Sequence, residues 1–182
     1  MTVYAFSTEN FKREKNEVDY IFKLPEEFFN SYIDELVEQN VQMLTIGHLE
    51  LAPERTQKVI KRCIERTKNN TGLKLVIAFI YGGRDDIICA TKKLAQQYKD
   101  GEISLDEINE QNFENQLMTA GLPPVDLMIR SSGEVRLSNF LLWQLSYSEL
   151  IFDETLWPDF DEAQLHKDLY IYQHRSRRFG GG

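Results

Sequence analysis

Residues 73–80, LKLVIAFI, form an almost unbroken apolar run that ends at the turn sequence YGGR of residues 81–84. A strand with one face in solvent alternates apolar and polar side chains, whereas a parallel strand covered on both faces is apolar throughout. The run therefore predicts a buried strand of a parallel sheet, with helices packed against both faces.

Segments with the spacing of strands and helices alternate on either side of this run. We expect further strands at residues 3–6, 41–46, 126–130 and 149–152, and helices at 24–37, 54–68, 87–98, 138–147 and 161–174, with another beginning at Ser104. This alternation favours an α/β fold with an open, mostly parallel sheet flanked by helices. Ligands of such sheets bind at the carboxyl ends of the strands.

Composition narrows the class of protein. A chain of 182 residues with 42% hydrophobic and 27% charged residues suits one globular domain over residues 1–182. A net charge of −8 disfavours nucleic-acid binding. No apolar run approaches the ~20 residues that span a bilayer, and the start MTVYAFSTEN lacks the features of a signal peptide. Cys63 and Cys89 have no paired metal spacing, so we interpret them as buried thiols in a reducing cytoplasm.

Phosphate-binding residue types gather after the expected strand at 126–130. Arg130 and Arg136 flank a stretch of serine and glycine, and Ser138 follows. Arginine donors fit phosphate oxygens, and glycine lets the backbone approach a ligand. We expect Ser138 to begin a helix whose free N–H groups would favour an anion. A serine-rich surface loop with ordinary arginines explains the pattern equally well.

Two other groups have less specific signals. The polar residues after the first strand offer hydroxyl, carboxylate, amide and guanidinium groups, but they also suit a capped turn: Ser7, Thr8, Glu9, Asn10 and Arg13. Glu149 opens an apolar strand and is either a magnesium ligand or a solvent-facing residue. The three histidines show no triad or metal spacing and are interpreted as surface or capping residues: His48, His166 and His174.

Together these stretches resemble the cis-prenyltransferase family, whose bacterial members make undecaprenyl diphosphate. The matching stretches run in the family's order: residues 4–10, 70–73, 81–84, 129–143, 156–160 and 177–181. The resemblance implies chain elongation in which isopentenyl diphosphate condenses onto an allylic diphosphate such as farnesyl diphosphate, giving a long polyprenyl diphosphate. Asp85 and Asp86 do not form the aspartate-rich motif of trans-prenyl synthases, because Cys89 stands where a third aspartate is required.

The resemblance also implies residue roles. Asn10 would assist proton removal as the catalytic residue, and the residues around it would line the substrate site: Ser7, Thr8, Glu9, Phe11 and Arg13. The diphosphate of isopentenyl diphosphate would be held by Arg130, Arg136, Leu137 and Ser138. Glu149 would bind Mg²⁺, and Arg178 and Gly180 would belong to a motif given to the partner subunit of a homodimer. The helix at 24–37 would wall a tunnel for the growing chain.

Departures from the family pattern qualify this expectation. The family's phosphate loop, Asp-Gly-Asn-Gly-Arg-Trp, does not occur in the chain, and Met1 falls inside what should be the second strand. Phe11 stands where tryptophan is usual, Ile80 replaces an asparagine and His48 replaces an aspartate. The chain by itself is therefore expected to be weakly active or inactive.

An alternative is a non-catalytic partner subunit that donates its C-terminal arginine motif to a catalytic chain. A simple phosphate-binding module would explain the arginines but not the apolar helix. The chain retains the residues that the resemblance assigns to diphosphate binding, which favours descent from an active enzyme. The implied location is the cytoplasm, with a lipid product that favours peripheral contact at the inner face of the membrane.

Overall fold

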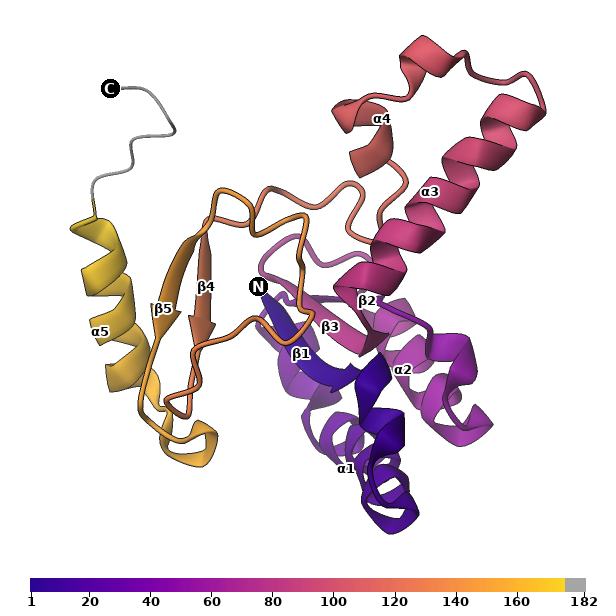
Figure 1. Cartoon of the computed structure of the whole chain (residues 1–182). Helices are drawn as coiled ribbons and strands as arrows, with labels where there is room; N and C mark the ends of the chain where they lie inside the picture. The colour runs from indigo at the N-terminus through magenta and orange to yellow at the C-terminus, as the bar shows by residue number, and fades with distance from the viewer. Residues whose placement is uncertain (176–182) are drawn as a thin grey trace. The chain divides into compact units, whose positions relative to one another are not determined.

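The computed structural model describes residues 1–175 of the chain, which divides into two compact units, Met1–Ala120 and Gly121–Gly182 (Figure 1). Each unit has a parallel sheet of its own and at least one helix, so the expected α/β class is confirmed. The extent of the domain over residues 1–182 stays a prediction.

The first unit is built on a three-stranded parallel sheet of order β1-β3-β2. Its strands are β1 (Thr2–Ser7), β2 (Gln42–Ile46) and β3 (Lys74–Tyr81). The apolar run at residues 73–80 is the central strand, as predicted, and its side chains from Phe79 to Tyr81 are almost completely buried. Because all three strands are parallel, their carboxyl ends meet at one edge of the sheet.

Four helices accompany this sheet among the described residues: α1 (Lys15–Glu38), α2 (Glu54–Thr67), α3 (Gly83–Lys99) and α4 (Glu110–Glu114). The core joins β1 and β3 to α1 through Phe6, Phe22 and Phe79, whose ring centroids lie 5.1 to 6.0 Å apart. Aromatic pairs at this separation stabilise a core beyond the burial of their area. Ile60 and Cys63 bring α2 into the same core.

Helix α1 is longer than the expected helix at 24–37 and buries only part of the expected apolar face. Phe29 and Ile33 are buried, as the apolar spacing predicted, but Leu24, Phe28 and Tyr32 are exposed. These three recur every fourth residue and form a second apolar stripe on the solvent side. The role of this helix as a tunnel wall stays a prediction.

The second unit contains the parallel pair β4 (Leu127–Arg130) and β5 (Glu149–Phe152), followed by helix α5 (Glu162–Gln173). The helix expected at residues 138–147 is wrong, since this segment is a series of turns. Its backbone has positive φ at Ser138, Asn139 and Leu141, which a right-handed helix does not allow.

Short 3₁₀ segments occupy several connections: Thr8–Lys12, Leu49–Leu51, Leu105–Glu107 and Trp157–Asp159. The capping pattern at Ser104 thus begins one 3₁₀ turn rather than an α-helix.

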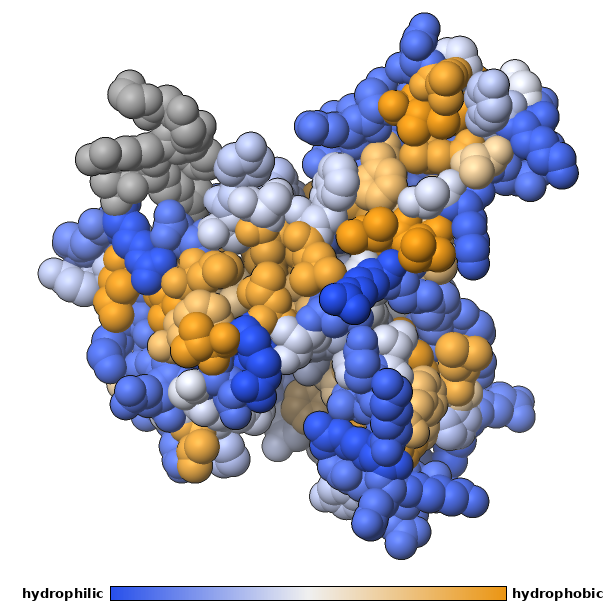
Figure 2. Space-filling view, viewed as in Figure 1, coloured by the Kyte–Doolittle hydropathy of each residue, from blue (hydrophilic) through white to orange (hydrophobic). Residues whose placement is uncertain are grey.

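Figure 2 shows hydrophobic residues over the tip where α3 leads to α4, and Leu105 and Ile108 of this segment are exposed. Within residues 1–175, no helix has the length and apolarity needed to cross a membrane.

Candidate functional site

The first group of predicted site residues lies where β1 ends and the 3₁₀ turn Thr8–Lys12 begins. The backbone N–H of Ser7 donates to Oδ1 of Asn10 at 2.8 Å, and the Thr8 hydroxyl donates to Glu9 at 3.1 Å. Asn10 therefore caps the turn that carries it. The structure brings these four residues together at the carboxyl edge of the sheet, where the fold predicted a ligand site.

Phe11 and Arg13 extend this group in different ways. The Phe11 ring meets the buried Phe6 ring edge-on, with centroids 5.3 Å apart, while nearly half of Phe11 stays exposed. Arg13 forms an ion pair with Glu17, one turn along the chain. Because both partners are about half exposed, the pair is weak and the guanidinium can turn toward an anion at little cost.

Sequence reasoning missed Tyr4, which lies beneath this group. Its hydroxyl donates to the carbonyl oxygen of Tyr81 at 3.0 Å, tying β1 to the end of β3. Burial, and then the charge of Glu9, raise the pKa of Tyr4 to about 12. The phenol consequently stays protonated at neutral pH as a hydrogen-bond donor.

The second group lies in the loop after β4, inside the second unit. Nη1 of Arg130 donates to the main-chain carbonyl of Arg136 at 2.6 Å and to the hydroxyl of Ser138 at 2.8 Å. The Arg136 guanidinium pairs with Glu134, and both side chains are largely exposed. Leu137 lies between these residues and is half-buried. The predicted diphosphate residues are thus brought together, although Ser138 begins no helix.

Backbone hydrogen bonds anchor this loop to the chain after β5. The N–H groups of Ser132 and Gly133 donate to the carbonyls of Thr155 and Asp153, each at 2.8 Å. Ser132 and Gly133 both have positive φ. For a serine this region of backbone space carries strain that the surrounding bonds must support, and such strained residues cluster at binding sites, whereas glycine adopts it without strain.

Glu149 lies apart from the arginine loop. It pairs in register with Leu127 at the start of β4, whereas Arg130 pairs with Phe152. Phe152 lies three residues beyond Glu149, or about 10 Å at the rise of a strand. The Glu149 carboxylate instead accepts from Arg175 at 2.9 Å. Glu149 and Arg130 therefore occupy opposite ends of this two-stranded sheet.

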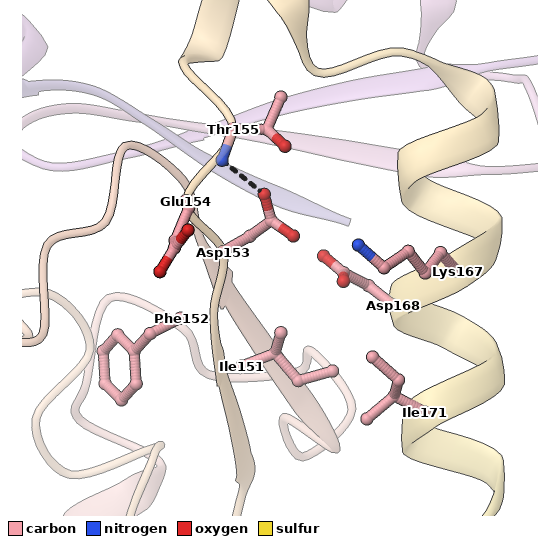
Figure 3. A pocket seen from close by; sticks show the side chains of 8 residues that line it. All are labelled: Ile151, Phe152, Asp153, Glu154, Thr155, Lys167, Asp168 and Ile171. Carbon is pink, nitrogen blue, oxygen red and sulfur yellow. Dashed lines mark hydrogen bonds between the residues drawn. The ribbon is translucent and has the colours of Figure 1, made fainter.

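A pocket of about 450 Å³ between the end of β5 and α5 is lined by three acidic residues that sequence reasoning missed, Asp153, Glu154 and Asp168 (Figure 3). Asp153 and Asp168 are both buried, and neither carboxylate oxygen of Asp168 has a hydrogen-bond partner among the described residues. Burial, and then the charge of Asp153, raise the pKa of Asp168. Hydrogen bonds from Thr155 lower the pKa of Asp153.

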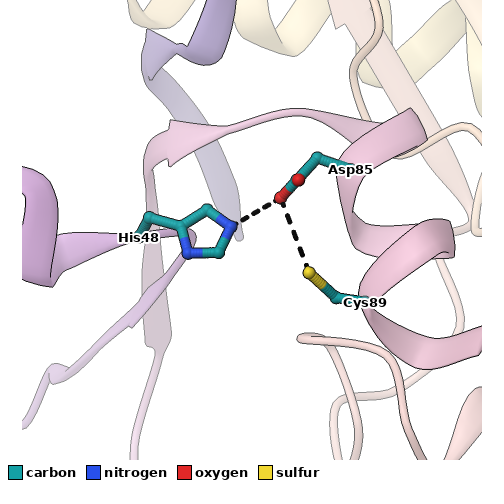
Figure 4. A group of neighbouring side chains, drawn as sticks. All are labelled: His48, Asp85 and Cys89. Atoms are coloured by element: carbon teal, nitrogen blue, oxygen red, sulfur yellow. Dashed lines mark hydrogen bonds and ion pairs between the residues drawn. The ribbon is translucent and has the colours of Figure 1, made fainter. Parts of the chain in front are cut away.

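Within residues 1–175, one group of three side chains offers ligand atoms close enough to share a metal ion: His48, Asp85 and Cys89 (Figure 4). His48 occupies the N-cap position of the 3₁₀ segment Leu49–Leu51, in line with the interpretation as a capping residue, and it also belongs to this group. Burial lowers the pKa of His48, but its hydrogen bonds to Asp85 and Glu50 outweigh burial and raise the pKa overall.

Burial, and then Asp85, raise the pKa of the Cys89 thiol. Cys89 is half-buried, and only Cys63 matches the predicted buried thiol. The predicted motif residues Arg178 and Gly180 lie outside the described residues.

Comparison with known proteins gives the family. Residues 1–180 match the family model described as "Putative undecaprenyl diphosphate synthase". The whole chain is 54% identical to 73% of a ditrans,polycis-undecaprenyl-diphosphate synthase of Micrococcus luteus, described as (2E,6E)-farnesyl-diphosphate specific. It is 49% identical to 70% of an isoprenyl transferase of Bacillus subtilis.

Among solved structures, the lavandulyl diphosphate synthase of Lavandula x intermedia, in complex with dimethylallyl diphosphate, is 42% identical with a TM-score of 0.95. That match covers 98% of this chain and 78% of the plant chain. The resemblance found in the sequence motifs is confirmed, and the chain belongs to the undecaprenyl diphosphate synthase family of prenyltransferases.

Proposed function

We propose that this protein elongates a cis-prenyl chain by condensing isopentenyl diphosphate onto an allylic diphosphate such as farnesyl diphosphate. The observation that supports this most directly is the loop after β4, where Arg130 holds the backbone of Arg136 and the hydroxyl of Ser138. A loop fixed in this way presents guanidinium and hydroxyl donors whose geometry suits a diphosphate. Family membership supplies the reaction class.

The reaction forms one carbon–carbon bond and releases diphosphate from the allylic substrate. The isopentenyl double bond attacks the allylic carbon, and a proton then leaves the isopentenyl unit. We assign assistance in that proton loss to Asn10, and contact with the substrates to its neighbours Ser7, Thr8, Glu9, Phe11 and Arg13. Arg130, Arg136, Leu137 and Ser138 would bind the isopentenyl diphosphate and offset its charge.

Magnesium is the cofactor that we propose, with Glu149 as its ligand in this chain. Mg²⁺ takes one or two carboxylates beside substrate phosphates, so one carboxylate at Glu149 fits by ligand type. When bound, the ion would neutralise charge that develops on the departing diphosphate. The Glu149 carboxylate must first leave Arg175, which also donates to the main-chain carbonyl of Leu150 at 2.8 Å.

A homodimer reconciles the positions of Glu149 and Arg130. The two residues lie at opposite ends of the β4–β5 sheet, about 10 Å apart along the strands. A second copy would let Glu149 of one subunit serve the diphosphate held by the other. The predicted contribution of Arg178 and Gly180 to the partner's site points the same way. A polyprenyl product is a lipid, which supports peripheral contact with the membrane.

The test is a condensation assay with labelled isopentenyl diphosphate, farnesyl diphosphate and Mg²⁺. It compares the chain of residues 1–182 with a version that carries a family phosphate-loop segment before residue 1. We expect polyprenyl diphosphate from the extended version and little from the shorter one. If neither makes product, yet the chain activates a separate prenyltransferase, the partner-subunit alternative replaces this proposal.

A further inference from the structure

The cluster His48, Asp85 and Cys89 lies within the first unit, at the carboxyl edge of its sheet. His48 follows β2, and Asp85 and Cys89 lie on the first turns of α3, which follows β3. Since β2 and β3 are hydrogen-bonded neighbours, their following segments meet at that edge. Asp85 and Cys89 are four residues apart and share one face of the helix.

The backbone fixes His48 in place. Its N–H donates to the carbonyl of Ile80 at 3.1 Å. The preceding Gly47 has φ of +104°, and a Cβ at this position would lie 2.2 Å from the Phe79 carbonyl oxygen. The turn that presents His48 to α3 is therefore packed directly against the end of β3 and has little freedom to move.

Ligand atoms of the three side chains face one another (Figure 4). All three lie within 4.8 Å of each other, with His48 Nε2 at 2.5 Å from Asp85 Oδ2 and Cys89 Sγ at 3.8 Å from the same oxygen. With metal bonds of 2.0–2.3 Å, the ligand atoms of a tetrahedral zinc site are spaced about 3.3–3.8 Å apart. The sulfur–oxygen spacing already fits, and the nitrogen–oxygen spacing needs to open by about 1 Å.

The other ring nitrogen of His48 has a carboxylate partner. Nδ1 lies 2.8 Å from Oε1 of Glu50. A metal ion would displace the proton that Nε2 shares with Asp85, and a proton kept on Nδ1 and shared with Glu50 would leave the Nε2 lone pair directed at the ion. Zinc-binding histidines are commonly oriented by a carboxylate in this way. Glu50 would hold the imidazole in the orientation that a metal at Nε2 requires.

We propose that His48, Asp85 and Cys89 bind Zn²⁺, with Glu50 orienting the imidazole and the fourth position open to water. An imidazole, a carboxylate and a thiolate form a ligand set that zinc takes in proteins, whereas Mg²⁺ prefers oxygen ligands. This site is distinct from the magnesium site proposed at Glu149 and does not depend on the proposed function. The ion would link the end of β2 to the start of α3.

The test titrates the purified, metal-free chain with Co²⁺, which replaces zinc and reports thiolate ligation by a charge-transfer band. We expect one equivalent of Co²⁺ to give that band, one equivalent of Zn²⁺ to remove it, and excess Mg²⁺ to leave it. Zn²⁺ should also raise the Tm of the chain. A wild-type chain with no charge-transfer band would overturn the proposal, since hydrogen bonds alone would then explain the cluster.

Variants locate the site. Cys89→Ser should abolish the band, whereas Cys63→Ser, the matched control at the other cysteine, should retain it. Glu50→Gln should weaken zinc affinity by roughly 10- to 100-fold, as for other carboxylates that orient a ligand histidine. Circular dichroism of each metal-free variant verifies that it is folded, and His48→Gln provides a second ligand variant if Cys89→Ser does not fold. A band lost in Cys63→Ser but retained in Cys89→Ser would also overturn the proposal.

Discussion

Nη1 of Arg130 donates a 2.8 Å hydrogen bond to the hydroxyl oxygen of Ser138. The same nitrogen donates to the carbonyl of Arg136, so Arg130 fixes the loop on which Arg136 is carried. The guanidinium of Arg136 has an exposed partner, Glu134, and exposed ion pairs contribute little stability. Arg130 is thus suited to shape the loop, and Arg136 is suited to meet a ligand.

The first prediction concerns Arg136→Ala in a version of the protein with condensation activity. We expect the KM for isopentenyl diphosphate to rise roughly 10- to 100-fold, because hydrogen bonds to charged groups contribute about 1.5–3 kcal/mol. The effect on kcat should be smaller. Steady-state kinetics with varied isopentenyl diphosphate measure both. Arg55→Ala, at an exposed arginine paired with Glu26, is the matched control, and an unchanged KM in Arg136→Ala would contradict the diphosphate role.

The second prediction concerns the glycine beside His48. Gly47→Ala should lower the free energy of unfolding by about 2–4 kcal/mol, since the new methyl group would overlap the Phe79 carbonyl at a strained φ. Gly101 also has positive φ but no neighbour within 4 Å of the added carbon. Gly101→Ala should therefore cost only about 1–2 kcal/mol, the strain of the left-handed region. Urea denaturation compares the two, and equal losses would show that steric overlap at Gly47 is unimportant.

The third prediction concerns the buried carboxylate of Asp86. It accepts from the Tyr81 hydroxyl at 2.9 Å and from the backbone N–H of Met118 at 2.8 Å. Asp86→Ala leaves both donors without this acceptor and should cost about 3–5 kcal/mol of stability. Tyr81→Phe removes one bond and should cost about 1–2 kcal/mol. Thermal or urea unfolding measures the difference, and a larger loss in Tyr81→Phe would reverse the assigned importance of the two residues.

Strands could be predicted from sequence where burial on both faces makes the strand apolar throughout. The run at 73–80 is apolar on both faces because it is the central strand of the first unit. The segment at 138–147 misled the same reasoning, since Leu141 and Leu145 are buried and spaced like one face of a helix. Their burial comes from turns with positive φ, and periodicity cannot distinguish the two backbones.

The candidate site residues also fall into those that sequence could place together and those that it could not. Motif residues that are close in sequence, such as Arg130 and Ser138, were predicted together because a short loop holds them. The pairing of His48 with Asp85 spans 37 residues and depends on β2 lying beside β3. Strand order is a property of the fold rather than of local pattern, so sequence spacing gave no signal for this cluster.

The last prediction is the pH dependence of Asp168. Burial, and then Asp153, raise its pKa above the ordinary value of 3.8. Below pH 3.8 the carboxyl is protonated in both the folded and unfolded chains and adds no penalty. As the pH rises through the raised pKa, the folded chain must ionise a buried group, and stability is lost. Glu154 and Lys167 also line this pocket, but Lys167 only partly offsets the shift.

Asp168→Asn should therefore remove the loss of stability on raising the pH, and the variant should be at least as stable as the parent at pH 7. Asp153 has a lowered pKa, so its contribution is present above its unfolded pKa and is lost as the pH falls. Asp153→Asn should then be less stable than the parent at pH 7, and the two variants should differ least near pH 3. Urea midpoints from pH 3 to pH 8 measure both profiles. A parent and an Asp168→Asn variant with the same pH profile would show that Asp168 carries no buried charge.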